Sequence, residues 1–590
     1  MKQFFKFVFA SMLGFILATL FVFIISFVFF AAVISGLESK TPEIKANSVL
    51  HMTFTEPVIE RSSNNPFKNL QFFPFASKSK LGLNDILNNL DKAAKDDNIK
   101  GIFLDLSDVN SGTSALKEIR DAMLVFKNSG KFIIAYGDFY SQGAYYLASV
   151  ADEIYLNPIG LLEFKGLAAT VTFFKGTLDK LEIEPQVIKH GKYKSAAESF
   201  VEKEMSPESK EQIAAIVDDI YDTFLNDISK SRNIEVGELR NIADQLLLQV
   251  TDDAVKYRFV DGLKYYDETL AILKERSGID ADKELQLAEM IKYTDVPKKR
   301  EEGISRDRIA VIYAIGNIVD GEDDDDEIIA SKNVAKTIRE AREDENVKAI
   351  VLRVNSPGGS AIASDVILRE IKLAKQSKPV VVSMSNVAAS GGYYISCAAD
   401  VIVAQPNTIT GSIGVIGLLM NGKKLLNNKL GVTLDTYKTG SYADIGSFGR
   451  PVTEYERKVI LVMIDDIYQK FINHVAEGRN LDVAFVDSIA QGRVWSGIDA
   501  MQLGLVDTLG GVDVAINIAA QKAGLEKYRI KELPEQKDPF EVILKELTGA
   551  QTAKVIEAEL GDNFKYYKSL KQIISNNGIR AMLPFELEIK

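Results

Sequence analysis

A long internal repeat is the feature that most constrains how this chain can fold. Residues 98–102 (NIKGI) return as 346–350 (NVKAI), and residues 142–146 (QGAYY) return as 390–394 (SGGYY), each 248 positions later. A chain of 590 residues with 46 % hydrophobic content can also bury more than one core. The sequence therefore predicts two related domains, each of about 210 to 230 residues, which is a common domain size.

Short apolar runs alternate with helical patterns in both copies of the repeat. The runs are 49–54, 101–104 and 132–135 in the first copy, and 309–315, 349–352 and 379–382 in the second. Buried strands of this kind, separated by helices, are typical of parallel βαβ units. The predicted fold class is therefore α/β, with two tandem repeats.

The N-terminal region is predicted to cross a membrane. Between Lys6 and Glu38 lie 31 residues without a charge, which exceeds the roughly 20 that span a bilayer. A cleaved signal peptide has an apolar stretch of only about 7 to 15 residues, so we interpret the segment as an uncleaved anchor. Lys2 and Lys6 precede it, and positive charge favours the cytoplasmic side. The rest of the chain is then expected on the outer face of the membrane.

These patterns divide the chain into five segments. They are a stub and transmembrane anchor (1–37), a first repeat (48–290), a linker (291–307), a second repeat (308–532) and a C-terminal extension (533–590). The linker is predicted from a polar stretch with turn formers at both ends. The extension has no counterpart in the first copy, and we expect it to be helical.

Composition argues against several classes of partner. The net charge is −12, from 70 basic and 82 acidic residues, and no dense basic stretch occurs, so nucleic acid is not an expected partner. Cys397 is the single cysteine, which rules out an intramolecular disulfide and a cysteine-rich metal site. The acidic run 322–327 is interpreted as a solvated loop, because adjacent like charges repel and lack the spaced ligands of a calcium loop; a cation site is the alternative. No metal or cofactor is predicted.

Ser390 is the candidate nucleophile. It follows the apolar run 380–384 and precedes a helical pattern, a position that exposes the side chain near the positive end of a helix dipole. The first copy has Gln142 at this place, so the turn itself does not require serine. Upstream, residues 355–360 (NSPGGS) follow another predicted strand, and adjacent glycines there can aim backbone N–H groups into an oxyanion hole.

Lys194 is the candidate base. A nucleophilic serine needs a base, which is most often histidine. The chain contains three histidines, His51, His190 and His474. None follows Ser390 closely, as a triad within one domain would favour. Lys194, in the segment 190–195 (HGKYKS), can act as a base if burial or a nearby cation lowers its pKa, although a single lysine is more often a solvated charge. The second copy has Ala443 at the equivalent place, so each copy holds one of the two groups.

Four motifs together resemble one family. They are 191–196 (GKYKSA), 354–360 (VNSPGGS), 388–396 (AASGGYYIS) and 410–414 (TGSIG). In this order and register they closely resemble the signal peptide peptidase A (protease IV) family, in its long, two-repeat, membrane-anchored bacterial form. The resemblance covers nearly the whole chain. It implies tandem Clp-protease/crotonase-like repeats of the ββα superhelix type, and a Ser/Lys dyad shared between the two repeats.

The resemblance also implies a role for each site residue. Ser390 would be the nucleophile, Lys194 the general base, and Ser412 would orient the lysine. The N–H groups of Gly359 and Gly391 would form the oxyanion hole. The family implies a homotetramer on the outer face of the bacterial cytoplasmic membrane that degrades cleaved signal peptides and other hydrophobic peptides.

The predicted function is a membrane-anchored, ATP-independent serine endopeptidase. One alternative is a crotonase-type enzyme that handles acyl-CoA, which would usually employ acidic residues in place of an essential serine. Another is a catalytically inactive membrane scaffold. The presence of both Ser390 and Lys194 disfavours the second alternative.

Overall fold

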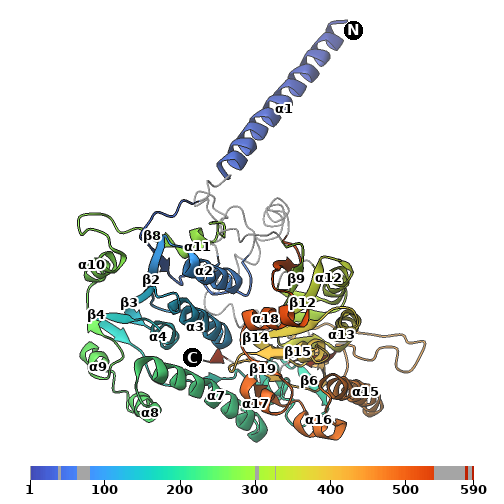
Figure 1. The fold of residues 1–590 in the computed structure, drawn as a ribbon. Helices are drawn as coiled ribbons and strands as arrows, with labels where there is room; N and C mark the ends of the chain where they lie inside the picture. Colours follow the sequence, from blue (N-terminus) through green and yellow to red (C-terminus); the bar gives the residue numbers. More distant parts are fainter. Residues whose placement is uncertain are drawn as a thin grey trace.

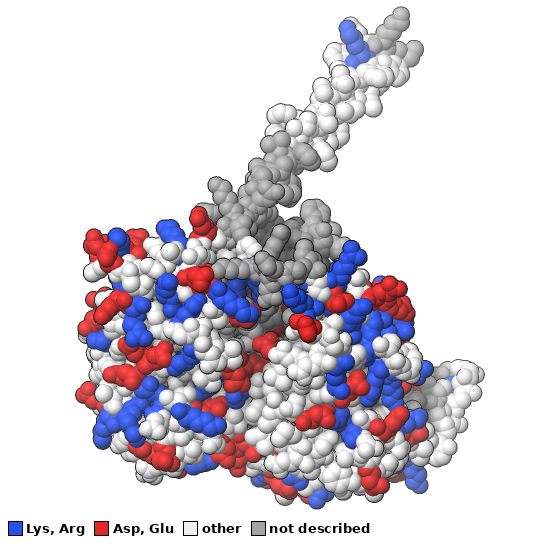
Figure 2. Space-filling view, in the orientation of Figure 1, with Lys and Arg blue, Asp and Glu red and all other residues white. Residues whose placement is uncertain are grey.

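The computed structural model describes residues 2–37, 42–62, 80–298, 305–323, 325, 327–536, 578–582 and 588–589. A single long helix, α1 (Lys2–Leu37), projects from a two-part body (Figure 1). Its segment Gln3–Ile25 has a mean hydropathy of 2.7 and is long and apolar enough to cross a membrane. In Figure 2 the part of the projecting helix that is not grey is uncharged, apart from basic atoms near its far end.

The first half is built on a parallel sheet. Its strands are β1 (Ser48–Met52), β2 (Ile99–Asp105), β3 (Phe132–Tyr140), β4 (Glu153–Leu162), β7 (Gly262–Leu263) and β8 (Leu287–Glu289). They lie in the order β7-β4-β3-β2-β1-β8, and every neighbouring pair is parallel. The strands predicted from the apolar runs of the first copy are therefore confirmed.

The second half repeats this arrangement. Its strands are β9 (Arg308–Ile315), β12 (Val347–Ser356), β14 (Val380–Ala389), β15 (Val401–Ala404), β19 (Thr508–Leu509) and β20 (Arg529–Leu533). The order β19-β15-β14-β12-β9-β20 matches the first sheet strand for strand, and all these pairs are parallel. Two further strands, β16 (Ile409–Gly411) and β18 (Val494–Ser496), extend the sheet beyond the end of β14. The predicted α/β class with two tandem repeats is confirmed.

Helices cover both faces of each parallel sheet, as such sheets require. In the first half these are α2 (Leu83–Lys95), α3 (Thr113–Lys127) and α4 (Gln142–Ala148) on one face, and α10 (Tyr266–Ser277) on the other. In the second half they are α12 (Ser331–Glu343), α13 (Ala361–Lys375) and α14 (Gly391–Ser396) on one face, and α18 (Val512–Lys522) on the other. Side chains that alternate along a strand therefore enter different cores: Ile102 and Leu104 pack on the α2 side, and Phe103 packs on the α10 side.

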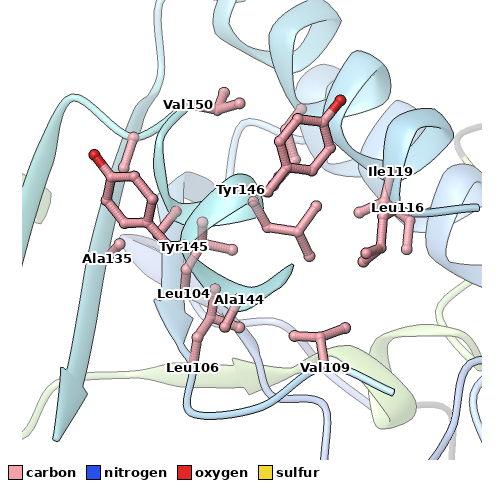
Figure 3. Packing of buried hydrophobic residues seen from close by; sticks show 14 of the residues in the cluster. Leu104, Leu106, Val109, Leu116, Ile119, Ala135, Ala144, Tyr145, Tyr146 and Val150 are labelled. Atoms are coloured by element: carbon pink, nitrogen blue, oxygen red, sulfur yellow. The ribbon is translucent and has the colours of Figure 1, made fainter. Parts of the chain in front are cut away.

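The cores are filled by residues spaced for a helix face. In α2, Leu83, Ile86, Leu87 and Leu90 recur at helical spacing and are buried. Figure 3 shows how the short helix α4 contributes two aromatic rings, with Tyr145 on the side of Ala135 and Tyr146 toward α3. The other α-helices in the described part of the chain are α5 (Lys175–Leu181), α6 (Glu198–Val201), α7 (Pro207–Arg232), α8 (Val236–Asp244), α9 (Thr251–Lys256), α11 (Met290–Tyr293), α15 (Glu454–Arg479), α16 (Val483–Ile489) and α17 (Gly497–Gln502), and Leu425–Lys429 forms a short π-helix.

A third sheet joins the two halves. Its strands are β6 (Glu184–Lys189), β10 (Asn317–Val319), β11 (Ile328–Ala330), β13 (Gly358–Ser360), β17 (Ile416–Asn421) and β21 (Gly578–Met582). They lie in the order β11-β10-β13-β21-β17-β6. Strand β6 comes from the first half and pairs antiparallel with β17 of the second, from Glu184 opposite Asn421 to Lys189 opposite Ile416. This pairing carries the chain that follows β6 into the second half.

Of the C-terminal extension (533–590), for which we expect a helix, the structure describes only residues 533–536, 578–582 and 588–589. Residues 537–577 and 583–587 lie outside the described residues, but Gly578–Met582 forms strand β21. The strand edges of β13 and β17 offer hydrogen bonds to this segment. A short strand, β22 (Glu588–Ile589), pairs with β5 (Ala169–Thr170).

Two smaller expectations can also be compared with the structure. The predicted linker 291–307 begins inside helix α11, which is anchored to the first half by Asn89 donating to the Met290 carbonyl.

In the acidic run 322–327, residues 324 and 326 lie outside the described residues. Within the described part of the chain, no group of three or more His, Cys, Asp or Glu side chains could hold a metal ion.

A buried ionic network links the two halves. Arg353 of β12 is 1 % exposed and donates to Glu60 at 3.0 Å and to Glu118 at 2.7 Å, both in the first half. It also donates to Ser383 of the neighbouring strand at 2.8 Å. The second Glu118 oxygen accepts from the Val512 N–H at 3.1 Å. Because these charges are removed from water, each depends on its partners.

Candidate active site

Ser390 lies in a strained turn between β14 and α14. Its φ of +55° is rare for a residue with a side chain, and such geometry persists only when the surroundings hold it. Two backbone bonds do so here: the Ser390 N–H donates to Gly411 O at 2.8 Å, and its carbonyl accepts from Tyr394 N at 2.8 Å. The end of a buried strand and the start of a helix thus fix the direction of the hydroxyl.

Lys194 reaches this turn from the other half of the chain. After β6, the loop at 190–194 lies against residues 491–492, where Tyr193 N donates to Gln491 O at 3.0 Å. The approach is close enough to require glycine: a Cβ added at Gly492, whose φ is +81°, would lie 2.5 Å from the Lys194 Cβ. Lys194 is 0 % exposed as a result.

The lysine amine contacts two serines. Lys194 Nζ lies 2.8 Å from Ser390 Oγ and 2.8 Å from Ser412 Oγ, and it donates to the Ser412 carbonyl at 3.1 Å. Ser390 and Ser412 are both 0 % exposed. The structure thus brings together the three side chains singled out in the sequence. Lys194 precedes Ser390 by 196 positions and Ser412 by 218 positions.

The surroundings favour a neutral lysine. Burial lowers the pKa of Lys194 well below its ordinary 10.5, because a buried ammonium loses its hydration. A neutral amine in contact with a hydroxyl can accept its proton. The three histidines are engaged elsewhere: His190 with Asp465, His51 with Asp105, and His474 with Lys372.

The glycines of the second half lie beside the serine turn. Gly358 and Gly359 have φ values of +103° and +156°, which side chains rarely allow. A Cβ added at Gly391 would lie 3.1 Å from the Gly359 N, so these two backbone groups are close neighbours. The Gly358 N–H is held by the Ser356 hydroxyl at 3.1 Å. Backbone amides gathered in this way can stabilise a developing oxyanion.

Sequence reasoning missed part of this environment. The docking of the lysine loop on Gln491 and Gly492 was not foreseen, nor was the Ser412 carbonyl as a second acceptor for the amine. Gly492 was the available signal of a turn, but a glycine does not identify what packs against it.

The chain is similar to characterised peptidases over most of its length. The model of peptidase family S49 matches residues 125–280 and 372–526, once in each half. Protease 4 of Haemophilus influenzae is 38 % identical over 452 residues, which cover 75 % of this chain and 73 % of that protein. The chloroplastic serine protease SPPA of Arabidopsis thaliana is 38 % identical over 454 residues, which cover 76 % of this chain and 66 % of that protein.

Among solved structures, a ClpP1 mutant from Listeria monocytogenes matches with a TM-score of 0.23 and 18 % identity, covering 34 % of this chain and 91 % of that chain. The family assignment rests instead on the two matched segments and on the long alignment to protease 4. Both agree with the repeat seen in the sequence and in the two parallel sheets. This chain therefore belongs to peptidase family S49, a family of serine proteases, and carries the family's repeat twice.

Proposed function

We propose that the chain is an ATP-independent endopeptidase that works through a Ser390/Lys194 dyad. The observation that carries the proposal is the 2.8 Å contact between the buried Lys194 amine and the Ser390 hydroxyl. Membership of a serine protease family supports the same assignment. One catalytic centre then serves both repeats, because each supplies one reacting group.

The mechanism follows from the contacts. Neutral Lys194 removes the Ser390 proton as the oxygen attacks a peptide carbonyl, and the ammonium then protonates the leaving amine. The acyl-enzyme is hydrolysed by a water that Lys194 deprotonates. The Ser412 hydroxyl and carbonyl hold the amine in line with Ser390. The Gly359 and Gly391 N–H groups stabilise the oxyanion in both steps.

The proposed substrates are hydrophobic peptides, including cleaved signal peptides, degraded beside the membrane. The similarity to protease 4 and the resemblance of the four motifs to the signal peptide peptidase A family support this preference. The apolar helix α1 supports a membrane anchor. Lys2 and Lys6 precede its apolar stretch, and this positive charge supports a catalytic body on the outer face of the cytoplasmic membrane. The homotetramer implied by the family resemblance stays a prediction.

Fluorophosphonate labelling tests the proposed chemistry. The probe phosphonylates activated serines, so we expect one adduct per chain, on Ser390, mapped by mass spectrometry of the detergent-extracted protein. The matched control is Ser390→Ala, which should take up no label. A wild-type protein that takes up no label but hydrolyses an acyl-CoA thioester would favour the crotonase-type alternative.

The kcat for peptide hydrolysis is expected to rise with pH as Lys194 loses its proton. Because burial lowers the pKa of Lys194, the midpoint should lie well below 10.5, and activity should be present above it and lost below it. The measurement is kcat between roughly pH 5 and 9, with Lys194→Arg as the control, since a guanidinium stays protonated throughout. A kcat that is flat over this range would contradict a titrating lysine base.

Removal of residues 2–37 is expected to release the protein from membranes. The segment forms one helix, whose apolar span Gln3–Ile25 has 23 residues and exceeds the roughly 20 that a bilayer requires. Fractionation of cells should find the full chain in the membrane pellet, resistant to a carbonate wash, and the truncated chain in the supernatant. A truncated chain that stays in the washed pellet would show that another surface holds it there.

A further inference from the structure

A buried glutamine joins the loop that carries Lys194 to the second half of the chain. Gln212 of helix α7 is 0 % exposed. Its Nε2 donates to the Ser195 hydroxyl at 3.0 Å and to the Tyr193 carbonyl at 3.4 Å, so the amide contacts the residues on both sides of Lys194. Its Oε1 accepts from the Val494 N–H of β18 at 3.2 Å. One side chain of the first half therefore links the lysine loop to a strand of the second.

Strand β18 also holds the turns that carry the two serines. Through its antiparallel neighbour β16 it holds Ser390, whose N–H donates to the Gly411 carbonyl at 2.8 Å. The chain at the start of β18 holds Ser412 directly, because the Arg493 carbonyl accepts from the Ser412 N–H at 2.7 Å. The two hydroxyl partners of the lysine are thus fixed relative to one strand, and the Gln212 amide fixes the lysine loop relative to the same strand.

An uncharged amide is suited to this link. The Val494 N–H can only donate, so it faces Oε1 of Gln212, and the NH2 group then faces the lysine loop. Both ends of the amide are removed from water, where a polar group left without a partner is costly, so the loop cannot move away without a penalty. A carboxylate at this place would favour the ammonium form of Lys194, whereas an amide adds no charge.

The two copies of the repeat differ at this position. Residues 218–221 (DDIY) of helix α7 return as 465–468 (DDIY) of helix α15, 247 positions later, and both helices have 26 residues. By the same offset, Val459 occupies in the second copy the position that Gln212 has in the first. The copy that lacks the lysine therefore lacks the amide as well, which ties the amide to the lysine and not to the packing of the helix.

We propose that Gln212 is a positioning residue of the peptidase, whose amide sets the approach of the Lys194 amine to the Ser390 hydroxyl. The inference rests on the proposed Ser390/Lys194 chemistry and adds a residue that acts through the neighbours of the base. Without the amide, the loop keeps its contacts with Gln491 and Gly492 but can shift relative to β18. A displacement of about 1 Å at a reacting group can lower a rate about 100-fold.

The test measures how fast, and how completely, a fluorophosphonate labels Ser390 in Gln212→Met. Methionine has a similar length but offers neither end of the amide. We expect the second-order labelling rate constant, and kcat for a fluorogenic peptide, to fall by about 10- to 100-fold. KM should stay nearly unchanged, because a buried amide cannot contact the peptide, and labelling should still reach one adduct per chain. A lower final extent of labelling at the wild-type rate would mean that Gln212 only stabilises the fold, and would overturn the inference.

Asn89→Leu is the matched control, because it also removes a buried amide that joins two segments. Asn89 is 2 % exposed and donates to the Met290 carbonyl at 3.0 Å and to the Thr294 hydroxyl at 2.8 Å, which links α2 to the segment that contains α11. The folded control protein should keep the wild-type labelling rate and kcat. An equal fall in this control would show that the rates report general loosening of the protein, and would contradict a positioning role.

A milder variant covers the case in which Gln212→Met does not fold. Ser195→Ala removes the 3.0 Å contact with the amide and should lower the labelling rate in the same direction; a wild-type rate would overturn the inference. Where both variants fold, the double variant should react no more slowly than Gln212→Met alone, since both changes break one contact, and additive losses would contradict this. The two proposals fail separately. A wild-type protein that takes up no label on Ser390 loses the peptidase function, whereas one that labels at the same rate in every variant loses only the positioning residue.

Discussion

Replacement of Lys194 by methionine is expected to lower kcat for peptide hydrolysis by at least about 1,000-fold, within the range that a general base contributes. Methionine keeps the buried aliphatic volume but cannot accept the Ser390 proton, and it leaves no cavity beside Gly492. The fold should remain intact, because the substitution replaces a buried amine with an apolar group. Ser390→Ala should reduce kcat further, toward the roughly million-fold loss seen when a nucleophile is removed.

The experiment measures kcat and KM with a fluorogenic peptide and follows folding by circular dichroism. Lys192→Met is the matched control, since Lys192 lies two residues away on the same loop, is exposed and stacks on Tyr193. It should retain nearly full activity. A Lys194→Met protein that is folded and retains a tenth or more of wild-type kcat would remove lysine from the mechanism.

Much of the fold could be predicted because its signals are local. The apolar runs at 101–104 and 349–352 are long enough, and flanked by enough helix pattern, to identify buried parallel strands. The repeat then makes the two sheets equivalent, and the observed strand orders agree. The candidate site could be proposed because the two copies of the repeat can be compared with each other. Gln142 occupies in the first copy the position that Ser390 has in the second, and Ala443 occupies in the second copy the position that Lys194 has in the first.

The third sheet could not be predicted from local patterns. Strands β6 and β17 are more than 200 residues apart in the sequence. The amino-acid pattern of each strand does not indicate which other strand it pairs with. Strand β21 is only five residues long. Its place is decided by two open strand edges that exist only after the rest of the chain has folded. The ion pairs of Arg353 could not be predicted either, because the sequence shows only one charged residue within a buried strand and does not indicate its partners.

The Arg353 network is where a single substitution should most affect the docking of the two halves. Arg353→Ala leaves Glu60 and Glu118 buried without their common cation, and breaking a buried ion pair in this way costs about 3–5 kcal/mol. We expect this loss in the free energy of unfolding, measured in urea at pH 8. As a control for surface charge, Lys283→Ala breaks an exposed pair with Asp280 and should cost less than about 1 kcal/mol.

The effect of Arg353→Ala should also depend on pH, and this separates its charge from its packing. Burial raises the pKa of Glu118 to about 6, so this carboxyl is ionised at pH 8 and largely protonated at pH 5. A protonated carboxyl does not need the guanidinium, and the destabilisation by Arg353→Ala should therefore shrink as the pH falls. Equal destabilisation at both pH values would mean that Arg353 acts through its volume alone.

The Arg353→Ala variant should also lose peptidase activity at pH 8 before it loses its helical circular-dichroism signal. Lys194 and Ser390 come from different halves, so separation of the halves breaks the dyad without unfolding either sheet.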